Sequence, residues 1–374
     1  MKKVIFISAL AIAAAVSCTK SDIVDTKFNE QIGFTTYLGR DAQTKATVTN
    51  KGNLTQFGVY GFYTAIVDYD PTTHTTANLM DKVVVSGSST TSWTYSPAKY
   101  WTNDSDKYTF FAYSPVAVAT AEGVAAPVIK YTVDNDLSEQ DDVIYSVNNR
   151  NVTKASCTEG EGDDATTYVS FEFKHALARL AVKANAKMYR PDGSEITADN
   201  QLAEGEEEDN TFTITNISIK GKFCTTGTMD LSTPYTTTDG VTTGGPVWSA
   251  TPSTTDVTYD LTGTVEQLLS ADLYNFSNPD GTPATENYLM MMPTDFSADG
   301  AAAILSVTYK VTYAGKTSAP ITKTVSVPTK FEQGKAYTIN LTLQRDENNA
   351  IKFTVESVDD WSLVTPEQNS NIKA

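Results

Sequence analysis

The chain has few of the residue types that form metal centres, disulfide frameworks and acid–base pairs. Its 374 residues include three cysteines (Cys18, Cys157 and Cys224) and two histidines (His74 and His175). Their spacings match no zinc pattern, so we expect no metal and no cofactor. Cys18 belongs to an export signal, and the other two cysteines are too few for a disulfide framework. We expect them to be free thiols, with a single bridge between them as the alternative.

Basic residues are also in short supply. The chain has 28 Lys and Arg against 45 Asp and Glu, a formal net charge of −17. Affinity for nucleic acid depends largely on Lys and Arg, so this balance argues against a nucleic-acid partner. The sequence also has no nucleophile elbow, no phosphate loop and no clear pair of catalytic carboxylates. We therefore do not expect an enzyme, although a carboxylate-based hydrolase stays open because acids are abundant.

Helix-period hydrophobic runs are scarce, whereas Thr, Ser, Gly and Asn are plentiful. This composition predicts an all-β chain with many turns, and its length is enough for two domains. Residues 57–63 are apolar on both faces, which suits an inner strand. Residues 304–313 and 321–327 are predicted to form a hairpin. We expect residues 232–256 to be a long surface loop, residues 265–273 to include a helical turn, and the domain boundary to lie between residues 187 and 210.

The first 18 residues have the pattern of an export signal. Two lysines precede an apolar stretch at residues 4–16, which is too short to span a bilayer permanently. Ala15-Val16-Ser17-Cys18 then resembles a bacterial lipobox, which predicts a lipid on the thiol of Cys18. The alternative is a plain secretory signal in which Cys18 has no role. After residue 18 no apolar run approaches ~20 residues, so a mature lipidated chain would be anchored to a membrane without crossing it.

A short strand is predicted soon after the signal. A polar tether at residues 19–30 precedes residues 31–38, in which Ile32, Phe34 and Leu38 share one face. The link that follows is polar and rich in small residues, which is where proteolytic nicking concentrates. Arg40 and Lys45 are the basic cleavage points within it.

His175 lies in an apolar stretch at residues 169–184 and invites a catalytic interpretation. The simpler interpretation is a core histidine that hydrogen-bonds neighbouring backbone, because no partner for catalysis is evident from the sequence. We favour the structural role.

Eight motifs in order make the chain resemble the fimbrillin-like proteins, the subunits of type V pili. After the lipobox they are Ile32-Gly33-Phe34 before Thr44-Lys45-Ala46, Phe57-Gly58-Val59-Tyr60, residues 108–115 (YTFFAYSP), residues 142–146 (DVIYS), residues 173–180 (FKHALARL), Gly334-Lys335-Ala336-Tyr337 and Val358-Asp359-Asp360-Trp361. The resemblance implies two tandem transthyretin-like β-sandwich domains, here residues 46–200 and 201–374, after a signal at 1–18 and a removable segment at 19–45. It also implies export to the surface of the outer membrane, cleavage after Arg40 or Lys45, and polymerisation with other pilus subunits by strand exchange.

The two ends of the chain share a pattern that bears on strand exchange. Ile32-Gly33-Phe34-Thr35 and Ile351-Lys352-Phe353-Thr354 both have the form Ile-x-Phe-Thr. We hypothesise that Ile351, Phe353 and Val355 of one subunit fill the sites left by Ile32, Phe34 and their neighbours in another. The alternative is that residues 351–355 are simply the last strand of their own domain.

A different class of function is a lipid-anchored monomeric adhesin that binds a host glycan or protein. Its contact surface would include exposed loop aromatics, for which Trp93, Tyr95 and Trp248 are candidates. Such a protein would stay uncut and would keep its lipid.

Overall fold

The computed structural model describes most of the chain between residues 30 and 360. The described residues are 30–38, 53–88, 91–120, 126–160, 162, 165–190, 194–197, 200, 203, 210–238, 241–262, 266–280, 287–297, 302–313, 315–327, 330–344 and 352–360. Within these ranges the regular structure is β-strand, with short 3-10 turns such as Val116–Ala119, Leu137–Glu139 and Ala155–Cys157, and the expected all-β class is confirmed. No helix in the described residues is long and apolar enough to cross a membrane.

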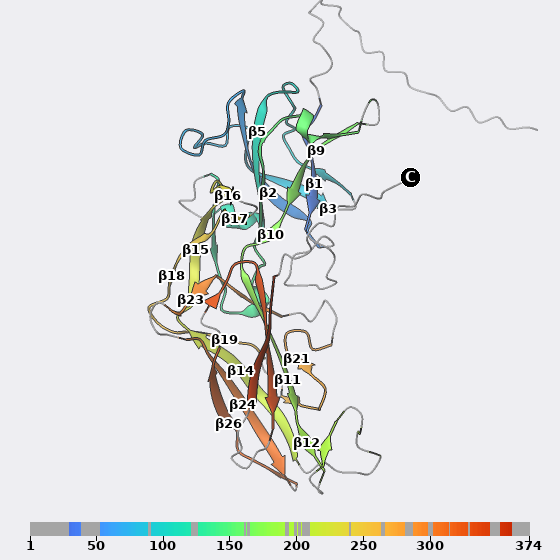
Figure 1. The fold of residues 1–374 in the computed structure, drawn as a ribbon, viewed down its shortest axis with the longest axis vertical. Helices are drawn as coiled ribbons and strands as arrows, with labels where there is room; N and C mark the ends of the chain where they lie inside the picture. Colours follow the sequence, from blue (N-terminus) through green and yellow to red (C-terminus); the bar gives the residue numbers. More distant parts are fainter. Residues whose placement is uncertain are drawn as a thin grey trace, which may run out of the picture.

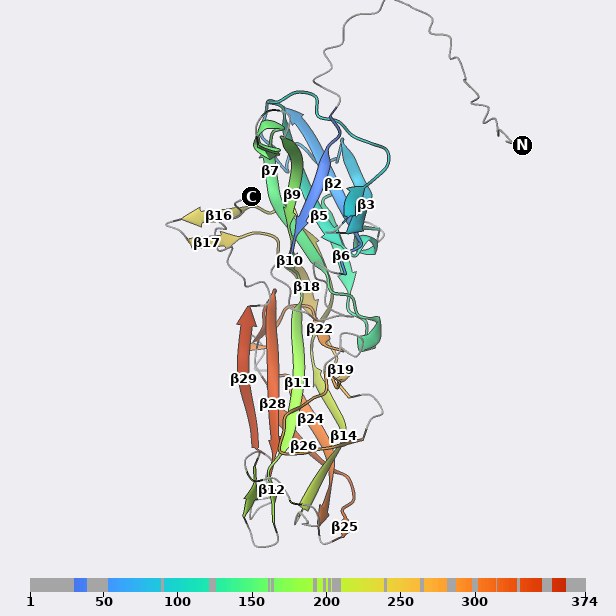
Figure 2. The ribbon, with the colours of Figure 1, turned by 90° about the vertical axis from the view of Figure 1, so that its right-hand side faces the viewer.

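The strands form two lobes stacked along the long axis of the molecule (Figures 1 and 2). In the upper lobe, a three-stranded sheet packs on a six-stranded sheet. The first has the order β1 (Gly33–Tyr37), β9 (Thr166–Glu172), β8 (Thr158–Glu159). The second has the order β10 (Lys174–His175), β7 (Ile144–Val152), β5 (Lys107–Ser114), β2 (Gln56–Ala65), β3 (Met80–Ser88), β4 (Thr91–Thr94).

The lower lobe also contains two larger sheets. One has the order β21 (Tyr274–Asn275), β11 (Ala178–Ala186), β28 (Lys335–Leu343), β29 (Lys352–Asp360), and β22 (Leu289–Met291) also pairs with β11. The other has the order β19 (Val257–Asp260), β14 (Asn210–Gly221), β24 (Ile304–Tyr313), β25 (Lys316–Thr317), with β20 (Gln267–Leu268) on β14 and β26 (Ile321–Ser326) on β24.

Smaller sheets complete the fold. Between the lobes lies a sheet of β18 (Trp248–Pro252), β15 (Cys224–Asp230) and β6 (Val128–Thr132). Three two-stranded pairs are β12 (Met188–Tyr189) with β13 (Glu195–Ile196), β16 (Tyr235–Thr238) with β17 (Val241–Gly244), and β23 (Thr294–Asp295) with β27 (Lys330–Phe331).

The six-stranded sheet has an apolar core on each of its two faces, because apolar side chains occupy both alternating sets of positions on its inner strands. Phe57 and Val59 of β2 face the three-stranded sheet and build the core of the upper lobe. Tyr60 and Phe62, at the alternate positions, face the other way into a larger core that continues through the β18–β15–β6 sheet to the lower lobe. A strand buried on both faces has neighbours on both sides, and β2 lies between β3 and β5, which confirms the predicted inner strand.

Several expectations have a clear outcome. β24 and β26 pair from Ile304↔Ser326 to Tyr309↔Ile321, which confirms the predicted hairpin partners. The predicted surface loop at 232–256 is wrong, because it contains β16, β17 and β18. The helical turn is not found in the described part of 265–273, where β20 pairs with β14. The division at residue 200 stays a prediction, and β11, which precedes that position, pairs with β28 in the lower lobe.

Candidate functional site at the first strand

The first strand fills a groove in the upper lobe. Ile32 is fully buried, and Phe34 and Leu38 are 3% and 7% exposed. Their even spacing puts them on one face, because side chains alternate along a strand. The structure therefore places all three residues of the predicted removable strand in the core of the upper lobe.

Phe34 is the centre of this contact. Its ring stacks on Phe171 of β9 with ring centroids 5.4 Å apart. It also meets Tyr95 at 5.3 Å, Phe110 at 6.0 Å and Phe57 at 6.3 Å. Aromatic pairs in such tilted and edge-on arrangements stabilise beyond the area that they bury.

The backbone of β1 is tied along one side and at its start. It runs parallel to β9, from Gly33↔Tyr168 to Tyr37↔Glu172. On the other side, in the residues that the structure describes, one bridge joins Gln31 to Tyr100. The bonds around this bridge are Ile32 N–H to Lys99 O (2.8 Å), Trp101 N–H to Glu30 O (3.1 Å) and the Tyr95 hydroxyl to Ile32 O (2.8 Å).

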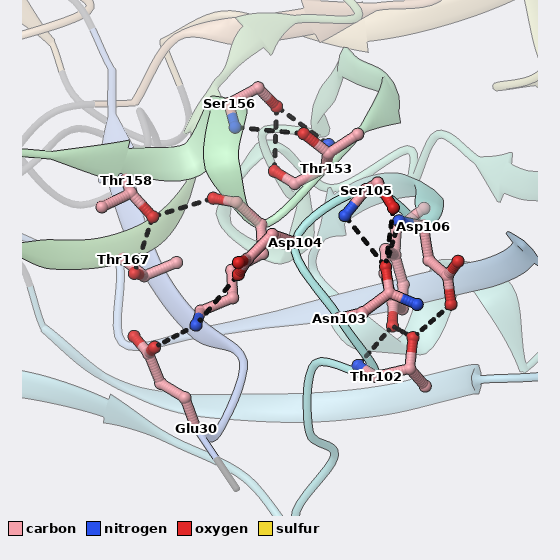
Figure 3. Close-up of polar contacts among 12 residues, drawn as sticks. Glu30, Thr102, Asn103, Asp104, Ser105, Asp106, Thr153, Ser156, Thr158 and Thr167 are labelled. Atoms are coloured by element: carbon pink, nitrogen blue, oxygen red, sulfur yellow. Dashed lines mark hydrogen bonds and ion pairs between the residues drawn. The ribbon is translucent and has the colours of Figure 1, made fainter. Parts of the chain in front are cut away.

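A cluster of charges marks the beginning of the strand (Figure 3). The Lys154 ammonium lies 3.1 Å from a carboxylate oxygen of Glu30 and 3.3 Å from one of Asp104. The Lys154 side chain is 16% exposed, and this burial acts to lower its pKa. The hydrogen bonds and charges of Glu30 and Asp104 outweigh that cost, so the pKa of Lys154 is raised.

The other residues predicted for strand exchange fall elsewhere. Cys18, Arg40, Lys45 and Ile351 lie outside the described residues. Phe353 and Val355 belong to β29, which lies at the edge of its sheet and, among the described strands, pairs with β28 alone. Val355 is opposite Ile339 and Phe353 is opposite Leu341, so β29 here completes its own lobe. The donor role of residues 351–355 stays a prediction.

His175 has a structural setting. It is buried, and its Nδ1 lies 2.9 Å from a carboxylate oxygen of Asp142, which is itself fully buried. The expectation of a backbone partner missed this carboxylate. Among the described residues, no three His, Cys, Asp or Glu side chains lie close enough together to hold a metal ion.

Cys157 and Cys224 are both free, which confirms the expected unpaired thiols. Burial raises the pKa of each thiol, and a side-chain hydrogen bond, with Ser156 for Cys157 and with Thr294 for Cys224, partly offsets this effect. Neither sulfur is therefore an activated nucleophile in this fold.

The loop aromatics proposed as a contact surface pack into the protein instead. Trp93 and Tyr95 contact the core of the upper lobe, and Trp248 contacts the larger core. The indole N–H of Trp248 donates to Ala176 O at 2.7 Å. Core packing thus accounts for all three side chains.

Comparison with known proteins agrees with this architecture. The fimbrillin-like family model matches residues 44–361. The chain belongs to the fimbrillin-like family. This fimbrillin-like chain is 24% identical over 400 residues to the fimbrium subunit Fim1C of Phocaeicola vulgatus, covering 97% of each protein.

A solved structure with a TM-score above 0.5 has a related fold. A fimbrial protein from Bacteroides vulgatus superposes with a TM-score of 0.57 and 19% identity, over 89% of this chain and all of the other. A putative cell adhesion protein from Bacteroides uniformis gives a TM-score of 0.44 and 15% identity, over 88% of this chain and 99% of the other.

Proposed function

We propose that this protein is a structural subunit of a cell-surface fimbrium. It is exported as a lipoprotein modified at Cys18, trimmed after Arg40 or Lys45, and joined to other subunits by a strand that takes the place of β1. The observation that carries the proposal is the buried first strand, which fills the core of the upper lobe through three side chains. Membership of the fimbrillin-like family supports it.

The way in which β1 is held suits a replaceable part. Within the described part of the chain its ladder joins it to β9 alone, so its removal would uncover one strand edge. It would also open the core above Phe57, Phe110 and Phe171. An unpaired edge beside an open apolar groove is a template for another strand.

The energy at stake is large enough to hold subunits together. Burying Ile32, Phe34 and Leu38 contributes about 1.5–3 kcal/mol for each side chain, or about 5–9 kcal/mol in all, before the backbone bonds are counted. A replacement strand that presents the same apolar alternation would recover this energy, whereas a one-residue slip would turn its side chains outward.

We propose the C-terminal strand, with Ile351, Phe353 and Val355, as the donor. Of the strands that the structure describes, only β28 pairs with β29, so β29 can leave the edge of its sheet without separating two neighbours. Its pattern matches that of residues 32–35 at the isoleucine, phenylalanine and threonine positions.

N-terminal sequencing of protein from the cell surface tests the trimming step. A start at Asp41 or Ala46 is the expected result. A blocked, lipid-bearing Cys18 on every molecule would contradict trimming and would favour the monomeric adhesin.

Electrophoresis of unboiled surface extracts tests the assembly step, because strand-exchanged polymers should run as a ladder. We expect Phe353→Asp to abolish the ladder. Thr354→Asp, at the alternate position of the same strand, is the matched control and should leave the ladder unchanged. Thermal unfolding of both uncut monomers checks that they remain folded. A normal ladder from folded Phe353→Asp would show that this donor assignment is wrong.

A further inference from the structure

The apolar face of β1 leaves one question of assembly open, which is the register of the strand that fills the groove. Alternation with a period of two excludes slips of one residue, because such a slip turns every side chain outward. A slip of two residues keeps the apolar face inward. Apolar positions alone therefore discriminate poorly between registers that differ by two.

The charge cluster at the start of β1 supplies a reference point for this register. Glu30 lies two residues before Ile32, the first fully buried residue of the strand. Its carboxylate meets Lys154, and its backbone carbonyl accepts a bond from Trp101 N–H. A two-residue slip would bring either Phe28 or Ile32 to the position of Glu30, and neither can pair with an ammonium group.

The groups that hold Lys154 do not belong to the first strand. The backbone carbonyl of Lys154 accepts a hydrogen bond from the Thr158 hydroxyl (2.9 Å). The Thr158 hydroxyl in turn contacts the Thr167 hydroxyl on β9 (2.9 Å). Thr153 and Ser156, on either side of it, bond each other through side chain and backbone (Figure 3). This turn is therefore anchored to β9 by contacts that are independent of β1.

The second carboxylate is anchored in the same way. Asp104 accepts a backbone bond from Ala155 N–H through its carbonyl, which ties its loop to the Lys154 turn. Asn103 stabilises the same loop by accepting from the N–H groups of Ser105 and Asp106 at 2.9 and 2.7 Å. None of these bonds involves the first strand, so removal of β1 takes away only one of the two carboxylate partners of Lys154.

We infer that Lys154 sets the register of the strand that fills this groove, by binding a carboxylate two residues before the strand's first buried apolar residue. The inference rests on the proposed function. The partner that it predicts is a strand with Asp or Glu at that position. In this chain's own C-terminal strand the position is Asn349 when Ile351 takes the place of Ile32, so the predicted partner is a sister subunit of different sequence and not a second copy of this chain. A largely buried lysine with preformed neighbours discriminates better than an exposed one, because less water screens its charge.

A peptide-exchange experiment on the cut protein tests this role. A recognition site for a site-specific protease replaces residues 41–45 of the full chain, and the chain is cut there. A fluorescein-labelled synthetic peptide of residues 27–38 then competes for the groove, and fluorescence anisotropy gives its Kd. The second peptide carries Glu30→Gln, a change that cannot affect the folding of the protein.

We expect Glu30→Gln to weaken binding to the wild-type protein about fivefold, which corresponds to about 1 kcal/mol. The same change should have no effect on Lys154→Met protein, because the partner is already absent. The difference in Kd between the two peptides on the wild-type protein should shrink in 0.5 M NaCl. The control is Lys107→Met, which removes the ion pair with Asp68 in the same lobe and should retain the full fivefold difference.

Equal weakening in wild-type and Lys154→Met protein, or no weakening in either, would overturn the role of Lys154 and leave the proposed function intact. Failure of any peptide to enter the groove of cut wild-type protein would overturn both, because strand replacement itself would then not occur.

Discussion

Truncation of the central side chain of β1 tests how firmly the strand is held. Phe34 is 3% exposed and is surrounded by four aromatic rings, so Phe34→Ala leaves a cavity that rigid neighbours cannot close. Buried Phe→Ala changes cost about 3–5 kcal/mol. Because β1 has one long ladder, we expect this loss to appear first as detachment of the strand and only then as loss of global stability.

Native-state proteolysis measures this detachment. A loss of 3 kcal/mol raises the population of the detached state roughly a hundredfold, and cleavage within the strand should accelerate by the same factor when reclosing is fast. Thermolysin digestion followed by mass spectrometry locates the cut. Thr35→Ala, at an exposed position of the same strand, is the control and should change the rate little.

The result that would refute this reasoning is a Phe34→Ala cleavage rate within threefold of the wild type. It would mean that the contacts of Phe34 contribute little to holding β1. The estimate of 5–9 kcal/mol for the three buried side chains would then also be wrong.

Three further predictions follow from the described side chains. Gly58→Ala should destabilise the fold by about 1–3 kcal/mol in urea unfolding, because a Cβ there would lie 2.2 Å from the ring of Tyr113, which is 1% exposed. Hydrogen bonds, chiefly from the Thr102 hydroxyl, lower the pKa of Asp106 below its usual 3.8, so its stabilising effect is present above about pH 4 and is lost as the pH falls through the lowered value. Asp106→Asn should therefore be less stable than wild type at pH 7, and the gap should narrow at pH 3 in urea unfolding. Cys224 should resist maleimide labelling, read by mass spectrometry, until the protein is unfolded, because burial raises the pKa of its thiol and limits access.

The sequence predicts those strands in which apolar residues alternate or cover both faces. β1, β2 and the β24–β26 pair all belong to this class. Their side-chain pattern is a direct consequence of which faces are buried, so it can be recognised without the rest of the fold.

The sequence does not predict the strands that lack this pattern. β16 and β17 are built mostly of threonine, and polar residues at both parities suggested a loop. Threonine is β-branched and favours extended backbone, so two such segments can pair without an apolar face. The helical turn predicted within residues 265–273 is also wrong. The residues of β20 are extended because they pair with β14, and their own side-chain pattern does not indicate a strand.

Some residues of the candidate site can be predicted from the sequence and others cannot. Ile32, Phe34 and Leu38 could be found from alternation alone. The parallel direction of β1 against β9 could not, because alternation is the same in either direction. Lys154 could not be found either, since its carboxylate partner at residue 30 lies far away in the sequence and leaves no local pattern.

The pairing of β1 with β9 has one more consequence, which concerns concentration. Gly33 and Tyr168 are neighbours in space although roughly 135 residues separate them, so β1 is in effect a ligand attached to its own receptor. Covalent attachment of this kind supplies an effective concentration of about millimolar, without any contact of its own. The proposed cut after Arg40 or Lys45 would leave the described bonds between β1 and β9 in place, yet it would release β1 to the dilution of the surroundings. A strand carried by a neighbouring subunit at high local density would then bind in its place by mass action.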